Sequence, residues 1–210
     1  MRIVVLGATG RTGRPLVEEL LRRGHTVVAL VRDPVRLGDV AQRVDVVRGD
    51  SRSAADLDRL VTGADAVVSA LGPTVKEASL HTDTATALVG AMQRAGVRRF
   101  VGVSGAGIDV PGDQKSLSAR MISKAIQTFA GDVIKDKPAE YEVYAASNLD
   151  WTLVRTPRLV DGAATGRLEH FAHRSTRSTQ VVRADLAAFV ADVIDQGSYV
   201  RQAPFFATAK

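Results

Sequence analysis

The feature that most restricts the fold of this chain is a series of glycines near its N-terminus, Gly7, Gly10 and Gly13. An apolar run at residues 3–6 comes directly before them, and residues 15–23 place leucine and valine at helical spacing after them. A buried strand, a glycine turn and an amphipathic helix in this order are typical of the first unit of a dinucleotide-binding sheet. The first glycine permits a tight turn, the second lets the backbone approach a pyrophosphate, and the third allows close packing of the helix. We therefore expect phosphate binding at the N-terminus of this helix.

The rest of the chain alternates short runs rich in valine and isoleucine with longer amphipathic stretches. This alternation predicts repeated strand–helix–strand units around a buried parallel sheet. The expected strands cover residues 2–6, 26–31, 44–48, 65–70, 99–103 and 151–155, with a further one at 204–207. The expected helices cover residues 15–23, 53–61, 79–95, 116–130, 136–147 and 183–195. Because 210 residues suit one α/β domain with a large core, we expect residues 1–210 to form a single Rossmann-type, doubly wound domain.

The composition excludes several classes of protein. Hydrophobic residues make up 45% of the chain and charged residues 24%, which is ordinary for a globular protein rather than a disordered one. The chain has no cysteine, so disulfides, thiolate catalysis and zinc sites built on cysteine are excluded. The apolar run at residues 3–6 is too short for a signal peptide, and no later run approaches the length of a membrane span. We therefore expect a cytoplasmic protein with no membrane partner.

The net charge of +5 indicates affinity for anions, either a dinucleotide phosphate or nucleic acid. The basic residues stand in separate groups, at residues 22–23, 98–99 and 174–177, and do not form one continuous run. Scattered groups of this kind are typical of solvated surface charge, so we do not expect nucleic acid as a partner. His170 and His173 have no third ligand nearby in the sequence, and we expect no metal site.

The residue that follows the second strand indicates which dinucleotide binds. An acidic residue at this point usually binds the ribose of NAD, whereas arginine accommodates the 2′-phosphate of NADP. This chain has Arg32 followed by Asp33, so NADP(H) is preferred and NAD(H) stays possible. Arg11 and Arg14 could converge on the same phosphate, because a guanidinium group binds phosphate oxygens in bidentate fashion; exposed helix-start charge is the alternative for both.

Other residues near the strand ends are also candidates for contacts with the cofactor. Thr9 and Thr12 can add hydroxyl donors beside the glycine turn. Asp50 and Ser51 follow the third strand and would lie beside the adenine, although Asp50 could instead cap the next helix. The residues after the fourth strand should run along the ribose, and they are Ala70, Leu71 and Gly72.

Five stretches of the chain together resemble a known family. They are residues 5–13, 30–34, 47–50, 66–72 and 147–157. In these stretches the chain resembles the atypical short-chain dehydrogenases/reductases with an NAD(P)H-binding domain, a group that includes flavin reductase/biliverdin-IXβ reductase-like and NmrA-like proteins. The resemblance implies the strand order 3-2-1-4-5-6 with a seventh strand.

The chain departs from the parent superfamily at the residues that transfer protons. Typical members use a Tyr-x-x-x-Lys pair, but neither Tyr141 nor Tyr144 is followed by lysine four residues later. The resemblance instead offers Lys137 as a group that binds the cofactor ribose and Ser104 as a group that polarises the substrate and also contacts the cofactor. Tyr141 is a further candidate acid. The structural alternatives are a loop-capping hydroxyl for Ser104 and a solvated charge before Pro138 for Lys137.

These observations favour an NADP(H)-dependent reductase that transfers hydride to a small conjugated acceptor, such as a flavin, quinone or tetrapyrrole. In such an enzyme the protein mostly positions cofactor and acceptor, so the missing pair need not abolish the chemistry. The alternative is an NmrA-like redox sensor that binds NADP(H) without turnover; an isomerase or epimerase is less favoured because it also needs the missing tyrosine. We expect the substrate pocket at residues 105–115 and 156–180, in a monomer or homodimer.

Overall fold

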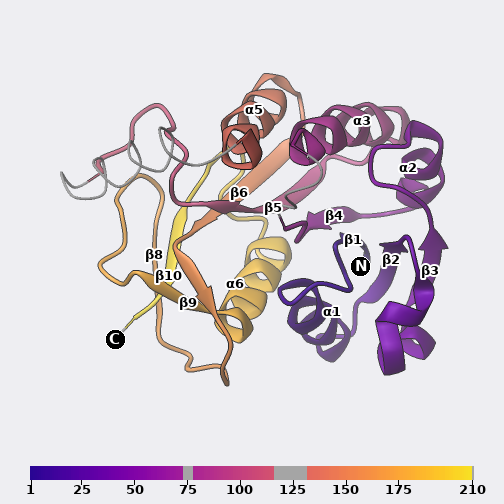
Figure 1. Ribbon diagram of the computed structural model, residues 1–210, viewed down its shortest axis with the longest axis horizontal. Helices are drawn as coiled ribbons and strands as arrows, with labels where there is room; N and C mark the ends of the chain where they lie inside the picture. Colours follow the sequence, from indigo (N-terminus) through magenta and orange to yellow (C-terminus); the bar gives the residue numbers. More distant parts are fainter. Residues whose placement is uncertain (73–77, 116–131, 210) are drawn as a thin grey trace.

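The most apolar strand of the chain lies inside the sheet. In β1 (Arg2–Leu6) every residue from Ile3 to Leu6 is buried, and the strand pairs in parallel with β2 on one side and β4 on the other. The computed structural model describes residues 1–72, 78–115 and 132–209. Its main sheet has eight strands in the order β3-β2-β1-β4-β5-β6-β10-β8 (Figure 1). The other strands of this sheet are β2 (Thr26–Val31), β3 (Asp45–Arg48), β4 (Ala66–Ser69), β5 (Arg99–Gly105), β6 (Asp150–Thr156), β8 (Leu168–Phe171) and β10 (Phe205–Thr208).

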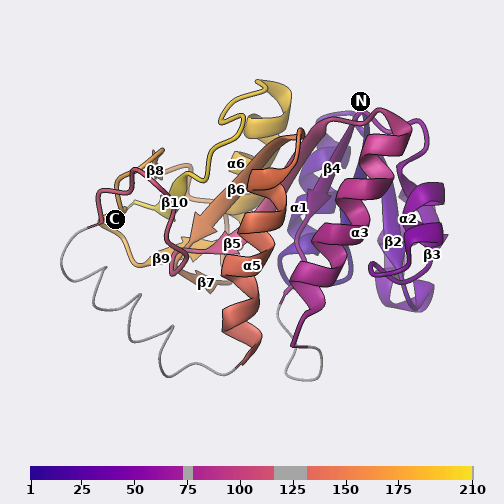
Figure 2. The same cartoon turned by 90° about the horizontal axis from the view of Figure 1, so that it is seen from above.

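The helices cover both faces of this sheet. One face carries α1 (Gly13–Arg22) and α6 (Arg183–Asp195), and the other carries α2 (Ala54–Val61), α3 (Leu80–Ala95) and α5 (Asp132–Ala146). Figure 2 shows α3 and α5 side by side, with α1 and α6 behind the sheet. A separate hydrophobic cluster fills each of the two interfaces. Among the described residues, no helix is both long enough and apolar enough to cross a bilayer.

The sequence predicted this architecture closely. The order 3-2-1-4-5-6 is confirmed, and β10 is the expected seventh strand. Every predicted strand and five of the predicted helices occur within a few residues of their expected bounds. The helix predicted at 116–130 lies outside the described residues. The helix predicted from residue 136 begins at Asp132, so Pro138 lies inside α5 rather than at its first turn.

Several short elements were not predicted. The strands β7 (Arg158–Val160) and β9 (Gln180–Val182) form a separate two-stranded sheet, and β8 pairs antiparallel with β10. A 3-10 segment, η1 (Pro34–Arg43), follows β2. The Asp33 carboxylate caps it by accepting from the Val35 amide at 3.2 Å, and the positive φ of Gly38 kinks it. The three-residue strands β7 and β9 are too short to carry a hydrophobic period of their own, and the kink at Gly38 interrupts the helical period of η1.

A buried ion pair fixes the loop after β5 to the sheet. Arg155 of β6 is fully buried, and its guanidinium donates to both carboxylate oxygens of Asp113 at 2.5 and 2.7 Å. The same guanidinium lies 3.7 Å from the ring centre of Phe205 and donates to the Ala203 carbonyl. Because a buried cation needs a partner, this pair anchors residues 106–113 over the carboxyl ends of β5 and β6.

We expect Asp113→Ala to lower the free energy of unfolding by about 3–5 kcal/mol, because it leaves the Arg155 charge buried without its carboxylate. Urea unfolding followed by circular dichroism measures this loss. The matched control is Asp58→Ala, which removes the exposed pair with Arg94 and should cost less than about 1 kcal/mol. Equal losses in the two variants would show that the Arg155–Asp113 pair is not an anchor.

Candidate functional site

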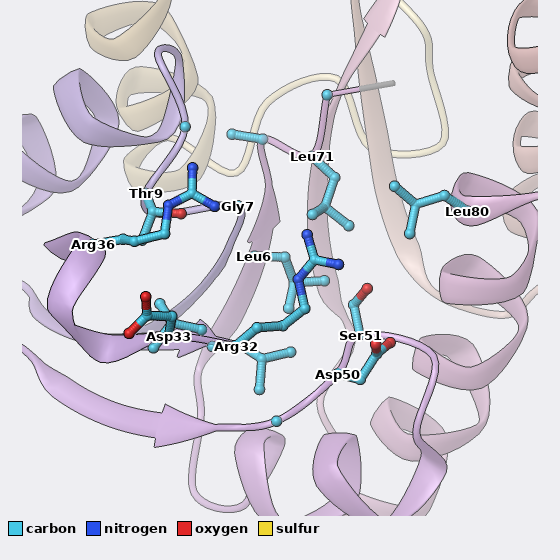
Figure 3. A pocket seen from close by; sticks show the side chains of 16 residues that line it. Leu6, Gly7, Thr9, Arg32, Asp33, Arg36, Asp50, Ser51, Leu71 and Leu80 are labelled. Atoms are coloured by element: carbon cyan, nitrogen blue, oxygen red, sulfur yellow. The ribbon is translucent and has the colours of Figure 1, made fainter. Parts of the chain in front are cut away.

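A pocket opens at the carboxyl ends of β1, β2, β3 and β4, where a doubly wound sheet binds its ligands (Figure 3). The glycine turn, the segment after β2, the segment after β3 and the segment after β4 each supply one part of its wall. The predicted residues that line it are Gly7, Thr9, Gly10, Arg32, Asp50, Ser51, Ala70, Leu71 and Gly72. Arg11, Thr12, Gly13, Ser104, Lys137 and Tyr141, which were also predicted, are not among the residues that line it.

Backbone atoms pack closely against one another at the glycine turn. Gly7 has a φ of +76°, and a Cβ atom added there would lie 2.8 Å from the Ala70 carbonyl carbon. A Cβ atom added at Gly13 would lie 2.0 Å from the Gly7 carbonyl oxygen. By contrast, a Cβ atom at Gly10 would approach only that same oxygen, at 3.2 Å. Gly7 and Gly13 are therefore required by packing, whereas Gly10 keeps the backbone open toward the pocket.

Because Gly13 is tightly packed and Gly10 is not, substitutions at these two positions distinguish an effect on folding from an effect on cofactor binding. We expect Gly13→Ala to lower the free energy of unfolding by about 3 kcal/mol or more, because the methyl group overlaps backbone that has no room to move. Gly10→Ala should lower it by less than about 1 kcal/mol and still weaken dinucleotide binding, since the methyl group occupies the approach to the pyrophosphate. Thermal unfolding and cofactor titration of both variants measure these effects. Gly105→Ala, whose Cβ atom would meet open space, is the control for the unfolding measurement.

Two arginines face the pocket from the segment after β2. Figure 3 shows the side chains of Arg32 and Arg36 extending from the end of β2 and from η1 into the cavity. Asp33 also lines the pocket, but one of its carboxylate oxygens accepts from the Val35 amide. Sequence reasoning missed Arg36, because its position depends on η1. The sequence did offer one signal for this segment, because Pro34 is a residue that favours the first turn of a helix.

The two arginines next to the glycine turn have partners in the protein. Arg14 donates to the Arg36 carbonyl at 2.5 Å and so ties α1 to η1. Arg11 donates to Asp161 at 2.8 Å, and Arg183 donates to the other oxygen of the same carboxylate at 2.7 Å. The Arg11 guanidinium, together with that of Arg183, lowers the pKa of Asp161. In this structure Arg11 and Arg14 therefore connect parts of the protein rather than converge on the pocket with Arg32.

The segment after β3 is held by its own polar contacts. Asp50 accepts from the backbone amide and the guanidinium of Arg52, and these contacts lower the pKa of Asp50. The Ser51 hydroxyl lies 2.9 Å from the Thr84 hydroxyl of α3. Ser53, rather than Asp50, caps α2 by accepting from the Asp56 amide. The capping alternative for Asp50 is therefore wrong, and its carboxylate lines the pocket.

The three residues predicted to act in catalysis lie at or near the carboxyl end of β5. Ser104 is buried, and its hydroxyl has no hydrogen-bond partner among the residues that the structure describes. The Lys137 ammonium lies within 3.0 Å of both Glu140 and His81 and 3.5 Å from the Val103 carbonyl oxygen. The Lys137 side chain is only 13% exposed, so its reading as a solvated helix-start charge is wrong. The structure brings Lys137 next to the Ser104 segment.

Tyr141 lies one helical turn after Lys137 on α5. Its ring packs edge-on against Trp151, with the ring centres 5.9 Å apart. Burial raises the pKa of Tyr141, which makes its phenol a weaker acid than a free tyrosine. The described residues 1–72, 78–115 and 132–209 contain no group of three or more histidine, aspartate or glutamate side chains that could hold a metal ion.

The match to known proteins covers most of the chain. Residues 7–197 match the NAD(P)H-binding family, and the chain therefore belongs to that family. The solved structures that it resembles include a short-chain dehydrogenase/reductase, and at this level of identity the likeness shows the fold alone.

Two solved structures illustrate the likeness in fold. A short-chain dehydrogenase/reductase from Veillonella parvula DSM 2008 in complex with NADP has a TM-score of 0.81 and 21% identity, with 98% of this chain and 94% of that chain covered. An anaerobillin reductase from Escherichia coli O157:H7 has a TM-score of 0.80 and 21% identity, with 100% and 98% covered.

Among curated proteins, a 3-diazoavenalumate denitrifying reductase from Streptomyces sp. is 44% identical over 89 residues, which are 42% of this chain and 25% of that protein. In the curated relatives matched here, the chain spans less than half of each relative's length.

Proposed function

We propose that this protein is an NADP(H)-dependent reductase that transfers hydride to a flat, conjugated small molecule, such as a flavin, a quinone or a tetrapyrrole. Membership of the NAD(P)H-binding family and the reductases among its relatives support the general class. We further propose that the cofactor is NADP(H) rather than NAD(H) and that the acceptor is conjugated.

The observation that carries the preference for NADP(H) is the pair of arginines in the pocket. Arg32 and Arg36 come from two neighbouring elements, and both line the cavity beside the glycine turn. A 2′-phosphate bound there would accept charge-assisted hydrogen bonds from both guanidinium groups. NAD lacks this phosphate. The acidic residue that would bind the ribose of NAD after β2 is Asp33, and its carboxylate already caps η1 by accepting from the Val35 amide.

The remaining wall fits the rest of a dinucleotide. The cradle at Gly7 and Gly10 leaves the backbone open at the N-terminus of α1, where amides and the helix dipole favour a pyrophosphate. Asp50 and Ser51 border the region expected for the adenosine, and Gly72, where a Cβ atom would meet open space, borders the path of the ribose. When bound, the nicotinamide supplies the hydride, and the protein positions the two reactants.

The residues proposed to act on the acceptor lie one strand further along the sheet. Strand β5 neighbours β4, and the unpartnered Ser104 hydroxyl stands at its carboxyl end. We assign Ser104 to the polarisation of an acceptor oxygen, with Lys137 beside it and Tyr141 one turn away. The acceptor would lie between the segments at 105–115 and 156–180, the first of which Arg155 anchors through Asp113.

We expect Arg32→Ala and Arg36→Ala each to raise the dissociation constant of NADPH by about tenfold or more, because each removes a hydrogen bond to the 2′-phosphate. The constant for NADH should change by less than about threefold, since NADH has no such group. Titration by protein fluorescence measures both. Arg43→Ala, which removes an exposed cation bound to Glu18 at the end of η1, is the control and should change neither constant. Equal losses for the two cofactors would contradict the assignment.

Turnover is the test that separates a reductase from a sensor. We expect purified protein to oxidise NADPH only when FMN, a quinone or biliverdin is added, as measured by loss of the absorbance of the reduced nicotinamide. Tight binding of NADPH with no loss on any of the acceptors would support a binding protein that senses the cofactor. No binding of either cofactor would contradict the proposal as a whole.

A further inference from the structure

A cluster of buried polar side chains lies between α3 and α5, next to the pocket. It consists of His81 at the start of α3 and Asp136, Lys137 and Glu140 at α5, and all but Lys137 are less than 10% exposed. Leu80, the residue before His81, lines the pocket. Buried charges of this kind are costly unless each has a partner, so their arrangement is specific.

Asp136 joins the two helices at the cluster. Its carboxylate accepts from the backbone amides of His81 and Thr82 at 2.6 and 3.0 Å, and so caps the N-terminus of α3 from outside. The backbone of His81 is therefore fixed relative to α5. Asp136 therefore has a structural role, and its contact with His81 involves the backbone amide and not the imidazole ring.

The His81 ring accepts a hydrogen bond from lysine. The Lys137 Nζ lies 3.0 Å from His81 Nδ1 and 2.8 Å from a Glu140 carboxylate oxygen. An ammonium group only donates, so Nδ1 accepts, and the ring proton is on Nε2. Burial and the charge of Lys137 lower the pKa of His81 to about 3, while Asp136 acts in the opposite direction. The ring is therefore neutral at physiological pH, as an acceptor on Nδ1 requires.

Lys137 has one weakly held N–H left. Its third contact is with the Val103 carbonyl at 3.5 Å, the limit for a hydrogen bond. Side chains alternate along a strand, and Phe100 stacks on Tyr144 of α5, so Ser104 points to this same face. The weak donor of Lys137 thus lies near Ser104. Within the described part of the chain, the Ser104 hydroxyl and His81 Nε2 are both buried and have no hydrogen-bond partner.

We propose that His81 and Glu140 are positioning residues that hold the Lys137 ammonium at the end of β5, with its third N–H ready for an oxygen atom of the bound ligand. This inference rests on the proposed function, in which Lys137 contacts the reactants. The oxygen belongs either to the cofactor ribose or to the acceptor, and the two cases share the same chemistry. Two of the three donors of Lys137 are fixed by the protein, so the direction of the remaining one is fixed as well.

The test compares His81→Leu with His81→Asn. Leucine removes the acceptor, so Lys137 loses its orientation, and we expect kcat to fall by about tenfold or more. Asparagine keeps an acceptor oxygen near the position of Nδ1 and should restore most of the loss. The matched control is His25→Leu, which removes a histidine bound to Asp195 on the opposite face and should leave kcat unchanged. A loss that asparagine does not restore, or an equal loss in the control, would overturn the proposal.

The same variants identify the ligand oxygen. A rise in the dissociation constant of NADPH in His81→Leu assigns the oxygen to the cofactor ribose. An unchanged constant with a higher KM for the acceptor or a lower kcat assigns it to the acceptor. We also expect Glu140→Ala to lower kcat by about tenfold or more, whereas Glu140→Gln, which still accepts a hydrogen bond from Lys137, should restore most of the loss. Equal losses in Glu140→Ala and Glu140→Gln would contradict the role of Glu140.

A spectroscopic measurement on the unmodified protein tests the inference without turnover. Long-range ¹H–¹⁵N correlation should show His81 neutral at pH 7 with its proton on Nε2, and the ¹⁵N signal of the Lys137 ammonium should shift when NADPH or acceptor is added. A protonated ring, a proton on Nδ1, or no shift with any ligand would overturn it. If no acceptor is reduced, the reductase proposal fails, whereas this measurement still decides the arrangement of His81 and Lys137.

Discussion

The contact between the Gly7 carbonyl and the backbone of Gly13 determines how the site is built. No side chain separates the two, because even a single Cβ atom at Gly13 would lie 2.0 Å from that oxygen. Gly7 in turn faces the backbone after β4, with a Cβ atom at 2.8 Å from the Ala70 carbonyl carbon. Three elements that border the pocket therefore meet through their main chains. Closely packed main chains cannot shift relative to one another without a clash. The N-terminus of α1 is therefore held in a fixed position relative to the end of β4.

The two faces of the sheet hold their charges in different ways. On the α1/α6 face, Arg23 binds Glu19 of its own helix and Asp192 and Asp195 of α6, which clamps the two helices together away from the pocket. On the α3/α5 face, the charges lie near the carboxyl end of β5, and Lys137 ends beside an unpartnered hydroxyl. Satisfied networks rigidify a protein, whereas unpartnered buried groups carry a cost. We place the chemistry on the α3/α5 face because Lys137 and Ser104 lie there near the carboxyl end of β5, the end of the sheet at which a doubly wound fold binds its ligands.

Local patterns in the sequence predicted the strands, most of the helices and the glycine turn, because these depend on residues that are neighbours in the chain, whereas the sheet order was implied by the family resemblance. The failures arose where distant residues decide the structure. Lys137 was assigned by the resemblance, but its partner His81 is 56 residues away, and no periodicity connects them. Pro138 suggested a helix start, yet α5 begins earlier and accommodates the proline in its interior. The small sheet of β7 and β9 joins segments twenty residues apart, with too few apolar residues in either to predict a strand.

The arginines around the glycine turn show why charge alone does not define a phosphate site. In the sequence, Arg11 and Arg14 follow the first strand, Arg32 follows the second strand, and Arg36 lies four residues further on. In the structure, Arg14 binds the backbone carbonyl of Arg36, so one cation holds the segment that carries another into the pocket. Arg11 is bound by Asp161, a residue some 150 positions later. Which guanidinium groups face the cavity therefore depends on contacts between elements that only the folded chain brings together.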